Sequence, residues 1–158
     1  MKVLFIDIDG VFNTDKGRRD NGRDFIDDSL LINLRRIVYA TKAELVLSST
    51  WRIMSEDRMM VQRALHNLGM QLFDKTPKLP GEVRDDEIRQ WLAENQKRYS
   101  IDKWAVLDDN DEADLKDGSY FRTTDRDGCT LEIAEKVIEY LNQDKTETQN
   151  GSSTSQPV

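Results

Sequence analysis

The chain has 158 residues, which is enough for one domain with a buried α/β core and too few for two domains of ordinary size. Its 30 acidic and 23 basic residues give a net charge of −7. This charge argues against a large basic surface that binds nucleic acid or an anionic membrane. A single cysteine, Cys129, excludes an internal disulfide.

The start of the chain predicts where the protein works. Residues 1–7 become acidic too early for a signal peptide, and no apolar run approaches the length of a membrane span. The lone cysteine is typical of a reducing compartment. We therefore expect a cytoplasmic protein that does not enter a membrane.

Short apolar runs alternate along the chain with segments of helical periodicity, a pattern typical of a mainly parallel sheet covered by helices on both faces. Strands are expected at residues 2–8, 44–48, 70–73, 103–107 and 120–123. Helices are expected at residues 29–40, 56–68, 83–95 and 130–141. The sequence thus predicts a three-layer, Rossmann-like α/β fold with a five-stranded sheet.

Two polar segments interrupt or end this pattern. Residues 13–28 are expected to form a polar loop, after which Ser29 can cap a helix. From Asn142 the composition shifts to Gln, Thr, Ser, Asn and Gly, which offer almost nothing to bury. We expect a folded domain over residues 1–141 and a disordered tail over residues 142–158.

The first motif is Asp7-Ile8-Asp9-Gly10-Val11, which directly follows the first apolar strand. Open α/β sheets build their sites beyond the carboxyl ends of their strands, so Asp7 and Asp9 can approach one ligand from different sides. Gly10 lets the backbone turn tightly there. An acidic turn without function is an equally good reading of this motif alone.

A second acidic cluster, Asp108-Asp109-Asn110-Asp111, ends the fourth apolar run. In a parallel sheet the two acidic ends converge on one edge, where mutual repulsion favours a neutralising cation. A ligand set made only of oxygens favours Mg²⁺ over zinc or copper.

A hydroxyl-rich turn follows the second strand, in the segment Ser48-Ser49-Thr50-Trp51-Arg52. Hydroxyl, backbone N–H and guanidinium groups all donate to phosphoryl oxygens, which makes Ser48, Ser49 and Arg52 candidate phosphate ligands. Trp51 is expected in the core or in the wall of the site. Taken alone, the segment also fits an ordinary helix-capping turn.

Together these motifs resemble the haloacid-dehalogenase (HAD) superfamily, whose first motif is Asp-x-Asp-Gly after the first strand. Within it, the chain is most similar to the domain described from Swiss-army-knife RNA-repair proteins. The resemblance covers the chain to about Leu141 and rests on residues 7–11, 48–52, 84–92 and 107–109, in family order.

The resemblance implies a Mg²⁺-dependent phosphatase that works through an aspartyl-phosphate. Asp7 would be the nucleophile, Asp9 the general acid/base, and Ser48 a phosphoryl-binding hydroxyl. The metal ligands would be Asp7, the backbone carbonyl of Asp9, and Asp108, with Asp109 in reserve. An acid at position 9 favours phosphoryl transfer over dehalogenation.

The third motif departs from the superfamily pattern, because the usual phosphate-neutralising lysine is not obvious. Arg84 occupies the expected place ahead of a helix, while Lys75 and Lys78 lie upstream. An arginine binds phosphate in bidentate fashion but does not simply replace lysine. We take Arg84 as the phosphate ligand and keep both lysines as alternatives.

The expected substrate is a phosphorylated end of RNA or DNA, because no segment remains for a sizeable cap domain and the loop after Asp9 contains Lys16, Arg18, Arg19 and Arg23. A solvated loop whose basic residues pair with nearby aspartates is an equally good interpretation. The alternatives for the whole protein are a phosphatase of small metabolites and a module that binds a phosphorylated end without turnover.

Overall fold

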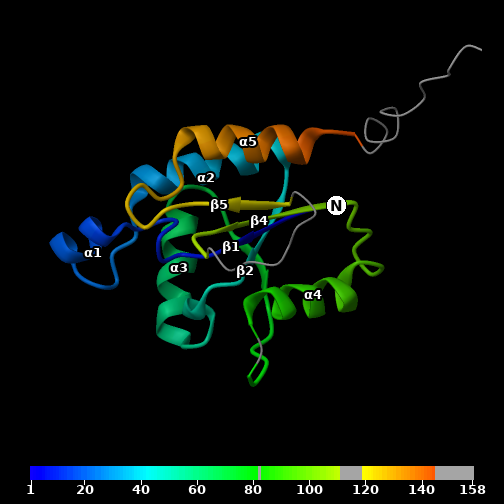
Figure 1. Ribbon diagram of the computed structural model, residues 1–158, viewed down its shortest axis with the longest axis horizontal. Coiled ribbons are helices and arrows are strands. Elements are labelled where there is room, and N and C mark those ends of the chain that lie inside the picture. Colours follow the sequence, from blue (N-terminus) through cyan, green and yellow to red (C-terminus); the bar gives the residue numbers. More distant parts are fainter. Residues whose placement is uncertain (82, 111–118, 145–158) are drawn as a thin grey trace, which may run out of the picture.

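The computed structural model describes residues 1–81, 83–110 and 119–144. Within these residues five strands and five α-helices follow one another along the chain, with α1 and α2 both between β1 and β2 (Figure 1). The strands are β1 (Lys2–Ile6), β2 (Glu44–Leu47), β3 (Leu72–Lys75), β4 (Lys103–Asp108) and β5 (Tyr120–Arg122). The helices are α1 (Asp15–Asn21), α2 (Asp28–Thr41), α3 (Ser55–Asn67), α4 (Arg84–Asn95) and α5 (Leu131–Asn142), with a 3-10 turn, η1, at Thr50–Arg52.

The five strands form one sheet in the order β3-β2-β1-β4-β5, and every neighbouring pair is parallel. The predicted Rossmann-like α/β fold is therefore confirmed. Strand β1 lies in the centre, between β2 and β4. The order reverses direction beside β1, and this switch point is where open α/β sheets place their ligands.

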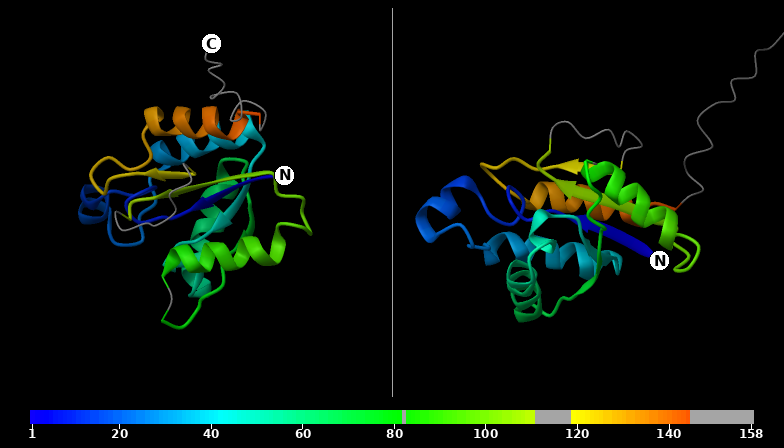
Figure 2. Two further views of the ribbon diagram at one scale, coloured as in Figure 1. Left: turned by 45° about the vertical axis from the view of Figure 1, so that its right-hand side comes forward. Right: turned by 90° about the horizontal axis from the view of Figure 1, so that it is seen from below.

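Alternation along the strands builds two cores, one on each face of the sheet. Leu4 and Ile6 point into the larger core with residues of α2, α3 and α5, whereas Val3 and Phe5 point into a smaller core closed by Trp91 of α4. Helices α2 and α5 lie side by side on one face and α4 lies on the other (Figure 2). The predicted helices on both faces are confirmed.

The third strand begins two residues later than the sequence predicts. The amide of Met70 donates to the Leu65 carbonyl, and Gly69 has a φ of +74°, so both residues form the turn that terminates α3. Met70 is buried through this helix termination and not through a strand position. Apolar character alone does not distinguish the two situations.

The expected polar loop at residues 13–28 is wrong in one respect, because it contains helix α1. Thr14 caps this helix by accepting from the Gly17 amide, and none of its residues is buried. A helix without a buried face leaves no apolar period in the sequence. The cap of α2 is also corrected, since Asp27 and not Ser29 accepts the first free amide, that of Ser29.

Only secondary-structure elements of ordinary length separate the described strands, so the described part of the chain contains no inserted cap domain. Helix α5 ends at Asn142, and most of the expected disordered tail, residues 145–158, lies outside the described residues. Among the described helices, none combines the length and the apolar character needed to cross a membrane.

Candidate active site

The acidic motifs meet at one edge of the sheet. Asp7 follows β1 directly, and its amide donates to the Leu107 carbonyl of β4, which continues the pairing that sets Asp108 beside it. A pocket of about 580 Å³ opens there. Its lining residues come from four separate segments of the chain: Asp7, Asp9, Thr50, Val83, Arg84, Asp109 and Asn110.

Three carboxylates form a cluster in this site. One oxygen each of Asp7, Asp108 and Asp109 lies within 4.8 Å of the others, and Asp7 and Asp108 are buried. Burial raises the pKa of Asp7 to about 6, with a further contribution from the Asp108 charge and opposition from Arg84. Burial and the Asp7 charge also raise the pKa of Asp109. The cluster therefore needs positive charge to stay ionised.

Arg84, the first residue of α4, supplies part of that charge. Its Nη1 donates to Asp7 Oδ2 at 2.9 Å and to Asp108 Oδ2 at 2.5 Å. Burial alone would lower the pKa of Arg84, but the two carboxylates raise it well above its usual value. The guanidinium thus stays charged beside the carboxylate expected to act as nucleophile.

The two alternative lysines lie elsewhere. Lys78 is exposed, and its Nζ lies 3.6 Å from Glu87 Oε1. Lys75 is exposed at the end of β3. Neither lysine lines the pocket that contains Asp7. This placement supports Arg84 as the basic residue of the third motif.

Two donors hold the Asp9 carboxylate, one on each oxygen. Asn13 Nδ2 donates to Asp9 Oδ1 at 2.9 Å, and Trp51 Nε1 donates to Asp9 Oδ2 at 3.1 Å. Asn13 also accepts from the Gly10 amide, so one side chain fixes the turn and the carboxylate together. These donors set the orientation of Asp9 toward the pocket.

The roles of Asn13 and Trp51 were missed from the sequence. Asn13 carried no motif signal, because an isolated asparagine in a polar loop is common. Trp51 is 6% exposed and belongs to the larger core, and its indole Nε1 reaches Asp9 from there without lining the pocket. An indole next to a hydroxyl-rich turn is the one clue that could have suggested its contact with Asp9.

Ser48 and Ser49 lie at the site, fully buried at the end of β2. The Ser48 hydroxyl donates to the Ile6 carbonyl at 3.1 Å. The Ser49 hydroxyl accepts from the Trp51 amide, and its hydrogen bond to Asp7 partly offsets the raised pKa of that carboxyl. Ser49 is therefore close enough to Asp7 to lower the pKa of that carboxyl, whereas Ser48 joins the β2 turn to β1.

Arg52 does not point into the pocket. Its Nε and both Nη atoms donate to the carbonyls of Ser48, Ser49, Thr76 and Pro77 and to Glu87, and the side chain is buried. The prediction that Arg52 binds phosphate directly does not fit this arrangement. A basic residue near a motif in sequence turns inward here because backbone carbonyls and an acid surround it.

Basic residues in the loop after Asp9 are paired with acids. Arg18 donates to both carboxylate oxygens of Asp125 and to Asn13, while Lys16 pairs with Asp20 and Arg19 with Asp15. Two of these pairs are exposed pairs along α1 and contribute little to stability. The arrangement matches the solvated-loop interpretation more closely than a dedicated phosphate track.

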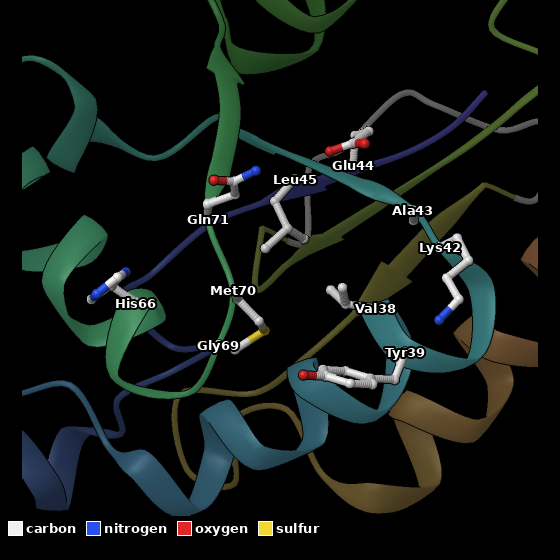
Figure 3. A pocket seen from close by; sticks show the side chains of 10 residues that line it. All are labelled: Val38, Tyr39, Lys42, Ala43, Glu44, Leu45, His66, Gly69, Met70 and Gln71. Carbon is white, nitrogen blue, oxygen red and sulfur yellow. The ribbon is translucent and has the colours of Figure 1, made fainter.

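A second pocket, of about 520 Å³, lies at the opposite end of the strands, near Glu44 and Leu45 where β2 begins (Figure 3). Tyr39 and Met70 form part of its apolar wall, and His66 and Glu44 are titratable residues in its lining. It contains no cluster of carboxylates or hydroxyls comparable to the Asp7 site. The chemistry therefore points to the pocket at the carboxyl ends of the strands.

Gly10 shows how tightly this site is built. Its φ is +74°, and a Cβ there would lie 2.1 Å from Asp109 Oδ2. We expect Gly10→Ala to displace Asp109 and to cost more than Gly81→Ala, since Gly81 has the same φ with nothing within 4 Å. The shared strain is about 1–2 kcal/mol. Urea unfolding of both variants measures the difference, and equal losses would show that Asp109 adjusts freely.

The raised pKa of Asp7 predicts how the metal-free protein responds to pH. Between about pH 4 and pH 6, Asp7 binds more protons in the folded state than in the unfolded state. Its contribution to the free energy of unfolding is therefore fully present below that range and is lost as pH rises through it. Asp7→Asn should stabilise the EDTA-treated protein by about 1–3 kcal/mol at pH 7 and by little at pH 4. Urea unfolding across this range is the measurement, and a pH-independent difference would contradict the prediction.

Comparison with known proteins agrees with this geometry. Residues 3–134 match the family described as the HAD domain in Swiss Army Knife RNA repair proteins. No curated protein matches the chain, and no solved structure matches it. The match covers β1 to β5 and all four motif segments. The chain therefore belongs to this family of HAD domains.

Proposed function

We propose that this domain is a Mg²⁺-dependent phosphomonoesterase in which Asp7 is the nucleophile and Asp9 the general acid/base. The observation that carries the proposal is the contact of one Arg84 nitrogen with both Asp7 and Asp108 in a cluster of three carboxylates. Such a site combines a nucleophile, an anchored acid and positive charge at one strand edge. It suits attack on a dianionic phosphate.

The residues present fit a magnesium ion. Asp7, Asp108 and Asp109 offer hard oxygen ligands from a partly buried cluster, and burial together with neighbouring carboxylates raises the pKa values of Asp7 and Asp109. Asp7 and Asp108 would hold the ion, together with the Asp9 carbonyl, and Asp109 lies close enough to assist. A bound ion would neutralise charge on the phosphoryl group.

The chemistry then proceeds in two displacements. A carboxylate oxygen of Asp7 forms a bond to phosphorus while the bond to the leaving oxygen breaks, and Asp9 gives that oxygen its proton. Asp9 next takes a proton from water, whose oxygen attacks phosphorus and releases inorganic phosphate from Asp7. Arg84 and the Ser49 hydroxyl donate to phosphoryl oxygens throughout.

A binding module that holds a phosphorylated end without turnover is the alternative from another class. Binding alone needs cationic and hydroxyl donors, but it does not need an anchored second carboxylate. Asp9 is oriented by two separate donors, Asn13 and Trp51, which favours a role in proton transfer. Catalysis is therefore the better-supported reading.

We further propose that the substrate is a phosphorylated end of RNA or DNA. The description of the family and the lack of an inserted cap among the described elements support this choice. Positive charge near the site contributes little to this choice, because Lys16, Arg18 and Arg19 each pair with an acid. A small-metabolite phosphatase is the rival within the same chemistry.

The test is a turnover screen of the purified protein with Mg²⁺. It compares kcat/KM for 3′- and 5′-phosphorylated oligonucleotides with values for mononucleotides and sugar phosphates, at low and moderate salt. We expect the oligonucleotide ends to be preferred. A preference for a sugar phosphate, unchanged when Arg18, Arg19 and Arg23 become alanine, would rule out the polymer substrate and leave the phosphatase intact.

A further inference from the structure

A buried ion pair, Arg52 with Glu87, lies behind the active site without lining its pocket. The two side chains are 3% and 4% exposed, and Arg52 Nη2 lies 2.5 Å from Glu87 Oε2. Burying two charges is costly unless hydrogen bonds satisfy them fully. This pair meets that condition, since every guanidinium nitrogen of Arg52 donates to at least one oxygen.

The contacts of this pair join three segments that are far apart in sequence. Arg52 Nη1 donates to the carbonyls of Ser48 and Ser49, at 3.0 and 2.8 Å. Its Nε and Nη2 reach the carbonyls of Thr76 and Pro77, which follow β3. Glu87 belongs to α4, and its other oxygen accepts from the Leu79 amide at 3.0 Å. The β2 turn, the segment after β3 and the first turns of α4 are thereby fixed to one another.

Two of the three joined segments, the β2 turn and α4, carry groups of the proposed chemistry. Trp51, adjacent to Arg52, donates to Asp9 Oδ2 at 3.1 Å, and Ser49 in the same turn lies close enough to Asp7 to lower the pKa of that carboxyl. Arg84 lies three residues before Glu87, about one helical turn away on α4. A shift of either segment would therefore move the donors that face Asp7 and Asp9.

We propose that Arg52 and Glu87 are positioning residues that hold Arg84 and the Ser48–Trp51 turn in register with Asp7. This inference rests on the proposed function for its catalytic consequence, but the mechanical link is independent of turnover. The planar guanidinium suits the task because it places several donors in fixed directions, which a lysine cannot reproduce. Neither residue needs to touch the substrate.

Hydrogen exchange of the whole protein tests the link without an activity assay. Arg52→Lys keeps the positive charge and removes the planar guanidinium with its several fixed donors. The matched control is Arg36→Lys, at an exposed site on α2. We expect about tenfold faster amide exchange in residues 48–53, 76–79 and 84–88 of Arg52→Lys, with β1, β4 and α5 unchanged. Exchange that is faster by the same factor throughout Arg52→Lys, or exchange that is unchanged in all three segments, would overturn the proposal.

A double-mutant cycle tests the catalytic consequence. Arg52→Lys should lower kcat/KM about 10- to 100-fold, and most of that loss should vanish in an Arg84→Ala background, because both changes then affect the same contact. Full additivity would mean that Arg52 does not position Arg84, and it would overturn that half of the proposal. If Arg52→Lys does not fold, Glu87→Gln takes its place in both measurements. A glutamine has the size of the glutamate that it replaces, but it loses the charge and one of the two acceptor oxygens.

The two experiments separate this inference from the proposed function. Faster exchange confined to the three segments in Arg52→Lys, together with a wild-type protein that turns over no phosphomonoester, would uphold the link and count against the phosphatase. Turnover with unchanged exchange and unchanged kcat/KM in Arg52→Lys would uphold the phosphatase and overturn the link.

Discussion

Asp7→Asn is expected to lower kcat by at least about 10⁴-fold, because an amide is a poor nucleophile and a weaker metal ligand. The fold should survive, since the Ile8 amide donates to Asp7 Oδ1 and can still donate to an asparagine oxygen. The amide NH₂ would then face Arg84, which keeps its contact with Asp108. Single-turnover and multiple-turnover assays with Mg²⁺ measure the loss.

The matched control for this variant is Asp24→Asn, an exposed carboxylate in the loop before α2, which should retain wild-type turnover. A circular dichroism spectrum and a Tm for both variants exclude unfolding as the cause. Substantial multiple turnover by a verified, uncontaminated Asp7→Asn preparation would remove Asp7 as nucleophile and with it the central claim of the mechanism.

The parts of the site that lie at strand ends were predictable from sequence. Each apolar run was followed at once by polar residues, and parallel strands bring such ends to one edge of the sheet. This reasoning correctly brought Asp7, Asp108 and Ser49 together. It required only the order of the elements and no knowledge of side-chain direction.

The parts that depend on side-chain direction were not predictable. Arg52 follows the same motif as Ser49, yet it turns inward, because Glu87 and four carbonyls form a buried acceptor set assembled from distant segments. Asn13 similarly gains its role only when the turn at Gly10 brings it under Asp9. Contacts of this kind depend on tertiary packing and leave no period in the sequence.

Arg84→Ala is expected to weaken binding of the phosphoryl group, with kcat/KM reduced about 10- to 150-fold, which corresponds to loss of one charge-assisted contact worth about 1.5–3 kcal/mol. The physical reason is its place beside Asp7 and Asp108, where no other described basic side chain makes a hydrogen bond to either carboxylate. Removal also leaves the carboxylates unneutralised, so the apparent Mg²⁺ requirement should change together with KM. Steady-state kinetics over a range of Mg²⁺ concentrations measures both effects.

Lys78→Ala and Arg89→Ala are the comparisons that give this result its meaning. Lys78 is the rival third-motif residue and contacts Glu87 only at 3.6 Å from an exposed position, so its removal should change kcat/KM by less than about threefold. Arg89 lies exposed on the same helix as Arg84 and controls for loss of one positive charge from α4. If Lys78→Ala proves to be the crippled variant and Arg84→Ala turns over normally, the third motif has been assigned to the wrong residue, while the roles of Asp7 and Asp9 are untouched.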